Sequence, residues 1–311
     1  MEPIENLAPE TAPALPPVPQ PSVVHRVFIG SDGLRAGWRF LIYFAAFRGL
    51  AIAFSEVNRP FVPHTEGLPP LWFFLLDECE RFVAAVVPAL VLCRFEKRPF
   101  GDYGLPRQGA FGKNFWSGTL WGIVAISILL VSLRGVGVFY FGGVVLHGLA
   151  VVKYAAYWGL LFLVVGFFEE FLLRGYTQFT LAKGIGFWPA ALLLSAAFGA
   201  IHLSNQGEAV IGALGAAAIG LFFCLTLRRT GNLWFAVGMH ASWDWGETFF
   251  YSVPDSGIVF PGHLMNPSFH GSRWLTGGTV GPEGSVLLFV LIAAMWVLFD
   301  RMYPAKRTAE N

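Results

Sequence analysis

Long apolar segments dominate this sequence and limit what it can fold into. A helix needs about 20 apolar residues to cross the hydrocarbon core of a membrane. Eight runs approach that length, at about 37–55, 71–93, 114–134, 154–181, 187–204, 209–227, 231–251 and 285–303. Only 13% of the residues are charged, about half of the ~25% that is usual in soluble domains. The sequence therefore predicts an all-α, polytopic membrane protein with about eight transmembrane helices.

The distribution of Lys and Arg predicts the orientation of these helices. If the N-terminus is cytoplasmic and eight spans alternate, fourteen basic residues fall on the inner side and four on the outer side. Cytoplasmic loops of membrane proteins carry such an excess of Lys and Arg. We therefore expect both termini to be cytoplasmic in a multi-pass integral membrane protein.

The ends of the chain differ in composition from its middle. Residues 1–24 contain seven prolines and no aromatic residue, which is typical of disordered or polyproline-like segments. We predict a Pro-rich disordered cytoplasmic tail at 1–34, a single transmembrane domain at 35–305 and a short cytoplasmic tail at 306–311. A net charge of +1 without a basic stripe argues against a nucleic-acid partner.

Ionisable side chains are costly in a membrane and are candidate functional groups, and three of the predicted spans carry the most informative ones. In chain order they are Glu169, Glu170, Arg174, His202, His240 and Asp244. Glu170 and Arg174 are four residues apart in the acid-first order, so they are expected to pair and to leave Glu169 free. With a rise of 1.5 Å per residue, Glu169, both histidines and Asp244 fall within a slab about 10 Å thick. Phe198, one turn before His202, is expected to pack beside it.

Such a group of side chains favours hydrolysis of an amide or ester within the membrane. A carboxylate beside a histidine can deprotonate a water, and a second histidine can stabilise an oxyanion. Glu169, His202, His240 and Asp244 are alternatively a zinc ligand set. Rival interpretations are a proton-coupled transporter and a haem protein with two histidine ligands.

The three motifs resemble those of the CPBP family, the CAAX-protease and bacteriocin-processing (Abi) intramembrane endopeptidases. The motifs Glu169-Glu170-x-x-x-Arg174, Phe198-x-x-x-His202 and His240-x-x-x-Asp244 occur in the family's order and on three of the apolar segments. The resemblance covers a catalytic core at about 100–250, and it implies cleavage of a peptide bond in a membrane-associated protein or peptide. A bacterial plasma membrane is the expected location, with membrane lipid as the surroundings.

The resemblance also implies a role for each of these residues. Glu169 and His202 would activate the water, while His240 and Asp244 would form the oxyanion side or bind a divalent metal such as zinc. Arg174 would orient Glu170 or its helix. Asp244 departs from the Asn found in prenyl-protein proteases, and an ionised Asp cannot donate a hydrogen bond to an oxyanion. A non-catalytic immunity or scaffold protein of the same fold is the alternative.

Overall fold

The structure is a computed structural model that describes residues 22–30, 33–62, 69–205 and 209–305. Its long helices are α2 (Ala36–Asn58), α3 (Leu71–Glu96), α4 (Lys113–Gly135), α5 (Leu149–Glu170), α7 (Phe187–His202), α8 (Val210–Thr230), α9 (Trp234–Trp245) and α11 (Val286–Met302). The shorter helical elements are α1 (Val23–Phe28), η1 (Arg59–Phe61), η2 (Phe100–Tyr103), η3 (Phe171–Tyr176), α6 (Thr177–Ile185), η4 (Gly246–Phe250), α10 (Arg273–Thr276) and η5 (Pro282–Gly284). The strands are β1 (Ile29–Gly30), β2 (Gly33–Leu34), β3 (Phe139–Tyr140) and β4 (Ser268–Phe269).

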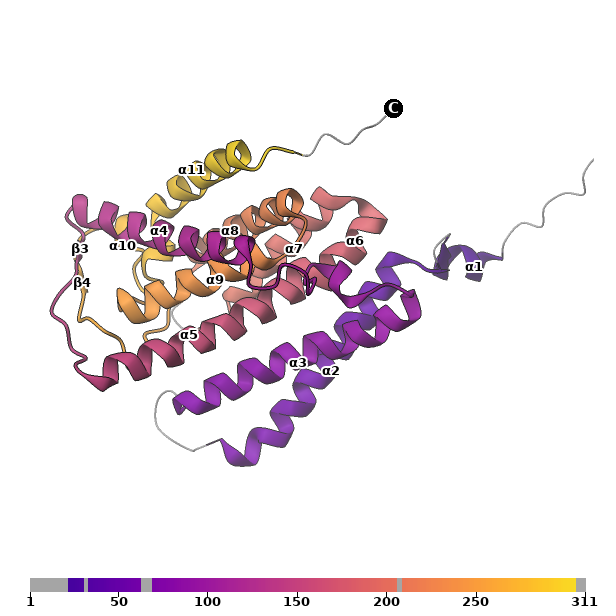
Figure 1. Cartoon of the computed structure of the whole chain (residues 1–311), viewed down its shortest axis with the longest axis horizontal. Helices are drawn as coiled ribbons and strands as arrows, with labels where there is room; N and C mark the ends of the chain where they lie inside the picture. The colour runs from indigo at the N-terminus through magenta and orange to yellow at the C-terminus, as the bar shows by residue number, and fades with distance from the viewer. Residues whose placement is uncertain (1–21, 31–32, 63–68, 206–208, 306–311) are drawn as a thin grey trace, which may run out of the picture.

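The helices form one bundle in which α9 occupies an inner position. Figure 1 shows α2 and α3 side by side along one flank, α11 on the opposite flank, and α9 between α4 and α5. The most extensive helix contacts are those of α4 with α9, α7 with α8, and α5 with α9. Ten residues of α9 are buried, from Trp234 through Asp244. The predicted site residues therefore lie on the most enclosed helix of the bundle and on its neighbours.

Glycines allow α4 and α9 to approach each other closely. A Cβ added to Gly118 would lie 2.0 Å from the carbonyl oxygen of Phe235, and one added to Gly238 would lie 2.3 Å from that of Phe115. Small residues permit such close contacts between membrane helices. The close packing fixes α9 against α4 and turns its His240 face toward α5.

Each of the eight predicted apolar segments lies on a helix. Four helical stretches of the described chain are both long and apolar enough to cross a membrane, namely Ala36–Phe61, Lys113–Gly135, Leu149–Ile185 and Val210–Thr230. The outward faces of α2 and α4 expose large apolar side chains, among them Leu41, Ile52 and Leu120. Such exposed apolar surface is expected in contact with lipid. The count of eight spans and the orientation of the termini stay predictions.

The described residues differ from an all-α fold in two small antiparallel sheets. β1 pairs with β2, and β3 pairs with β4, with Phe139 opposite Phe269. Residues 23–30 and 33–34, predicted as part of a disordered tail, form α1, β1 and β2. The rest of the predicted Pro-rich tail (1–21) and the predicted C-terminal tail (306–311) lie outside the described residues.

Two predicted spans are interrupted by wider helical turns immediately after the candidate site residues. The π-helical turn η3 begins one residue after Glu170, and η4 begins two residues after Asp244. Within η3, Gly175 has non-helical dihedral angles (φ −84°, ψ −119°) and marks a kink before α6. Wider turns of this kind occur frequently at functional sites.

Candidate active site

The four residues predicted as catalytic line one cavity. Glu169 comes from the end of α5, His202 is the last residue of α7, and His240 and Asp244 lie one turn apart on α9. The cavity has a volume of about 320 Å³ and extends from α3 and α5 to the segment that follows α9. Segments well separated in sequence therefore meet at this cavity. This agrees with the prediction that their polar side chains lie at a similar depth in the membrane.

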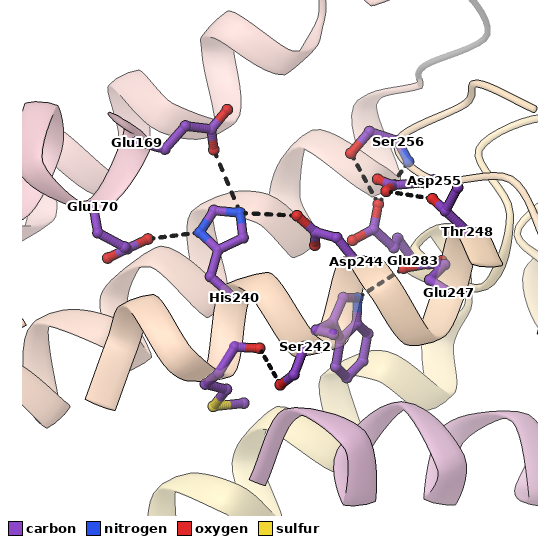
Figure 2. A network of polar contacts seen from close by, with 12 residues as sticks. Glu169, Glu170, His240, Ser242, Asp244, Glu247, Thr248, Asp255, Ser256 and Glu283 are labelled. Carbon is purple, nitrogen blue, oxygen red and sulfur yellow. Dashed lines mark hydrogen bonds and ion pairs between the residues drawn. The ribbon is translucent and has the colours of Figure 1, made fainter. Parts of the chain in front are cut away.

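His240 is the centre of the polar network (Figure 2). Its Nδ1 lies 2.9 Å from Oε1 of Glu170. Its Nε2 lies 3.6 Å from Oε2 of Glu169 and 3.4 Å from Oδ2 of Asp244. The Glu170 contact has the length of a hydrogen bond, whereas the two Nε2 contacts exceed the usual 2.7–3.2 Å. Nε2 is therefore not committed to either carboxylate, and Glu169 is next to an imidazole rather than free of polar neighbours.

The predicted pairing of Glu170 with Arg174 is present and fully buried. Arg174 Nη1 donates to Oε1 of Glu170 at 3.1 Å, and both side chains have no exposed surface. The guanidinium lies 4.5 Å from the centroid of the Phe198 ring, a cation–π arrangement. Gly220 of α8 makes room for it, because a Cβ there would lie 2.2 Å from Arg174 Nη2.

His202 is held by its own helix. Its Nδ1 lies 2.9 Å from the carbonyl oxygen of Phe198, and its ring packs edge-on against the Phe198 ring with centroids 4.5 Å apart. Because a carbonyl oxygen can only accept, Nδ1 carries the proton, and Nε2 of the neutral ring has a free lone pair. Phe198 thus contacts both His202 and Arg174, which links two of the three motifs.

The charged turn of α3, with Asp77, Glu78 and Arg81, was not among the candidate site residues predicted from the sequence. Arg81 forms ion pairs with Asp77 at 2.6 Å and with Glu78 at 3.4 Å, and all three line the cavity with Glu169. A second cavity lies between α2, α3 and α7, and Arg81, Glu169 and His202 line it as well. Glu169 and His202 therefore face both cavities. The unusual number of charged residues in the apolar segment of α3 is the sequence feature that could have predicted their place beside the cavity.

A second group of carboxylates lies beyond Asp244 (Figure 2). Glu247 of η4, Asp255 of the following loop and Glu283 of η5 have oxygens that all lie within 4.8 Å of one another. Burial raises the pKa of the Asp255 carboxyl well above its usual range, and the nearby carboxylates of Asp244 and Glu283 raise it further. We call Glu247, Asp255 and Glu283 the carboxylate trio; the sequence did not predict it.

The predicted catalytic residues do not bring three candidate zinc ligand atoms together among the described residues, although Glu169 and Asp244 each have an oxygen near Nε2 of His240. Zinc binds His nitrogen and carboxylate oxygen at about 2.0–2.2 Å, usually with four ligands in a tetrahedron. Among the described residues, the group of three whose candidate ligand atoms are all within 4.8 Å of one another is the carboxylate trio, which contains no histidine. Glu169 and Asp244 instead flank Nε2 of His240 as charge partners. No catalytic step is therefore assigned to a metal.

Comparison with known proteins identifies the family of the central segment. Residues 151–246 match the family model described as type II CAAX prenyl endopeptidase Rce1-like. Comparisons with curated proteins and with solved structures return no match. The matched segment runs from α5 to the start of η4 and contains all three motifs. The match confirms the resemblance to the CPBP family and, with the four long apolar helices, supports an integral membrane hydrolase of the CAAX-protease type.

Proposed function

We propose that this member of the Rce1-like, CPBP group of membrane proteases is an intramembrane endopeptidase in which Glu169 activates a water. The observation that carries the proposal is that Glu169, His202, His240 and Asp244, from three helices, line one cavity. The expected substrate is a peptide segment of a membrane-associated protein that reaches this cavity. Its cleavage is a hydrolysis that needs no group other than water and the side chains described.

Glu169 is the proposed general base. Its side chain is 25% exposed, and it faces both cavities, whereas the neighbouring Glu170 is buried and engaged by Arg174 and His240. A general base must reach both water and substrate. Of the two adjacent carboxylates, Glu169 therefore has the position of the general base, whereas Glu170 is placed to orient His240.

His202 is the proposed second anchor of the water. With its Nδ1 proton directed to the Phe198 carbonyl, the Nε2 lone pair can accept one hydrogen of a water while Glu169 takes the other. Two acceptors fix the orientation of the water, so that an oxygen lone pair is directed at the substrate carbonyl carbon. Positioning of this kind is lost when either acceptor is removed.

His240 is the proposed oxyanion donor. Nδ1 donates to Glu170, and Nε2 is not committed to a hydrogen bond of normal length. A proton on Nε2 can therefore be donated to the oxygen that becomes negative when water attacks the carbonyl. Glu169 then transfers the proton it has taken to the leaving amine, and the C–N bond breaks. Glu170, Asp244 and Arg174 position His240 and balance its charge.

The proposal is tested with purified protein in lipid nanodiscs and a library of membrane peptides. Wild type is expected to cleave at least one peptide, and Glu169→Gln and His202→Gln are expected to reduce kcat by about 10²–10⁴. Glu56→Gln is the matched control, because Glu56 is an exposed residue on α2 that pairs with Arg59. Full activity in both site variants would contradict the assignment, as would substrate transport without cleavage.

A further inference from the structure

The carboxylate trio joins three segments beside the cavity. Glu247 is fully buried in η4, and Asp255 and Glu283 are half-buried in the loop after η4 and in η5. Residues 252–285 connect α9 to α11, so the trio is where the start and end of this long connection meet α9. Oxygens from all three carboxylates lie within 4.8 Å of one another.

Protein donors engage one oxygen of each carboxylate. Trp243 Nε1 donates to Glu247 Oε2 at 2.7 Å, and Thr248 Oγ1 donates to Asp255 Oδ2 at 2.9 Å. The backbone N–H and the hydroxyl of Ser256 donate to Glu283 Oε2 at 2.9 and 3.0 Å. Oε1 of Glu247 is buried and has no hydrogen-bond partner within the described residues. A buried carboxylate oxygen without a partner is costly and points to a group that binds there.

Positive charge is lacking at the trio. In the part of the chain that the structure describes, the ion pairs within 4.0 Å involve other carboxylates, and none includes Glu247, Asp255 or Glu283. Partly desolvated like charges at this separation repel one another strongly. A bound cation removes the repulsion and uses the free oxygens at the same time.

We propose that the trio is a Ca²⁺ site that fastens the 252–285 connection to α9. Ca²⁺ binds six to eight oxygens at 2.3–2.6 Å, so oxygens on opposite sides of the ion are about 4.8 Å apart. The oxygens of the trio all lie within 4.8 Å of one another, so they can share one Ca²⁺ ion, and water completes the coordination. Mg²⁺ demands near-ideal octahedral geometry and usually keeps several waters, so three protein carboxylates suit it less well. Because the site is next to Asp244, the ion also sets the charge at that end of the cavity.

The site is tested by Tb³⁺ luminescence and by thermal unfolding of the purified protein in nanodiscs. Tb³⁺ replaces Ca²⁺ at oxygen sites and is excited by a nearby indole, here that of Trp243. We expect Tb³⁺ emission that saturates and is displaced by Ca²⁺. We also expect Ca²⁺ to raise the midpoint of thermal unfolding by about 2–4 °C, with a smaller shift from Mg²⁺. Neither measurement uses proteolysis, so the result is independent of the proposed activity.

Variants of the trio test whether the Tb³⁺ emission and the Ca²⁺-dependent shift of the unfolding midpoint come from this site. Glu283→Gln and Asp255→Asn each keep the shape of the side chain and should abolish both the Tb³⁺ signal and the Ca²⁺ shift. Glu56→Gln, at an exposed carboxylate on α2, should leave both unchanged. If one of these two variants fails to fold, the other is used to test whether the trio binds the ion. Absence of both responses in wild type, or their persistence in a folded trio variant, would overturn the proposal.

Discussion

The two groups of carboxylates along the cavity differ in how their charge is balanced. Glu169, Glu170 and Asp244 surround His240, and the guanidinium of Arg174 pairs with Glu170. The carboxylate trio has hydroxyl, indole and backbone donors but no ion pair within the described residues. The first group thus has a cationic partner of the chain's own in Arg174, whereas the trio has none among the described residues.

This difference indicates separate tasks for the two groups. A site built from its own acids and bases can bind a water and move a proton. A group of carboxylates without a cationic partner can instead hold a hard cation. The variants below are ordered from the largest expected change in free energy to the smallest.

The largest effect is expected from Arg174→Met, which leaves the buried Glu170 without its guanidinium. Removal of one partner of a buried ion pair typically destabilises a protein by about 3–5 kcal/mol. The same change at the exposed Arg59, which pairs with Glu56 on the surface, should cost about 0–1 kcal/mol. Thermal unfolding in nanodiscs measures both variants. Equal stability of the two would show that Arg174 does not balance the charge around His240.

His240→Phe should have the next largest effect, on catalysis. The new ring can keep the stacking on Phe223, whose centroid lies 5.7 Å from that of His240, but both N–H donors are lost. Loss of one oxyanion donor lowers kcat by about 10²–10³. His270→Phe, at an exposed histidine outside the cavity, is the control. A His240→Phe enzyme within a few-fold of wild-type kcat would exclude the proposed oxyanion donor.

Asp244→Asn should have a smaller effect, because the proposed role of Asp244 is to position His240. Asn keeps the size of the side chain and an oxygen near Nε2, and its amide can donate where the carboxylate cannot. We expect kcat to change by less than about tenfold with KM nearly unchanged, whereas Asp244→Ala should lower kcat further. Steady-state kinetics of both variants measure this. Complete loss of activity in Asp244→Asn would mean that the ionised carboxylate takes part in the reaction itself.

Local spacing made part of this arrangement predictable from the sequence. The pairing of Glu170 with Arg174 and the packing of Phe198 on His202 depend on residues four apart in one helix, and both are present. The meeting of the three motifs at one cavity follows from the depth of their residues along apolar segments, because helix rise is constant. The helical periodicity of the polar residues can be read from the sequence, and the rise per residue is the same in every α-helix.

Contacts between segments far apart in the chain were not predictable in this way. Asp255 and Glu283 approach Glu247 only because a long connection folds back, and no helical period relates such positions. The β3–β4 pairing joins residue 139 to residue 269 for the same reason. The π-helical turns after Glu170 and Asp244 also escaped prediction, because an apolar run has the same composition with or without a wider turn.

The smallest effect separates the two groups most directly and comes from removing divalent cations. Chelation should lower the midpoint of thermal unfolding by about 2–4 °C through loss of the cation from the trio. At a temperature well below the midpoint, kcat should stay within about twofold of its original value, because in the proposed mechanism Glu169 and His202 bind the water without a metal. Added Ca²⁺ should restore the midpoint, and added Zn²⁺ should not. If chelation abolishes cleavage by protein that remains folded, a metal takes part in the chemistry at His240. The two groups would then both depend on cations, and the contrast between them would not hold.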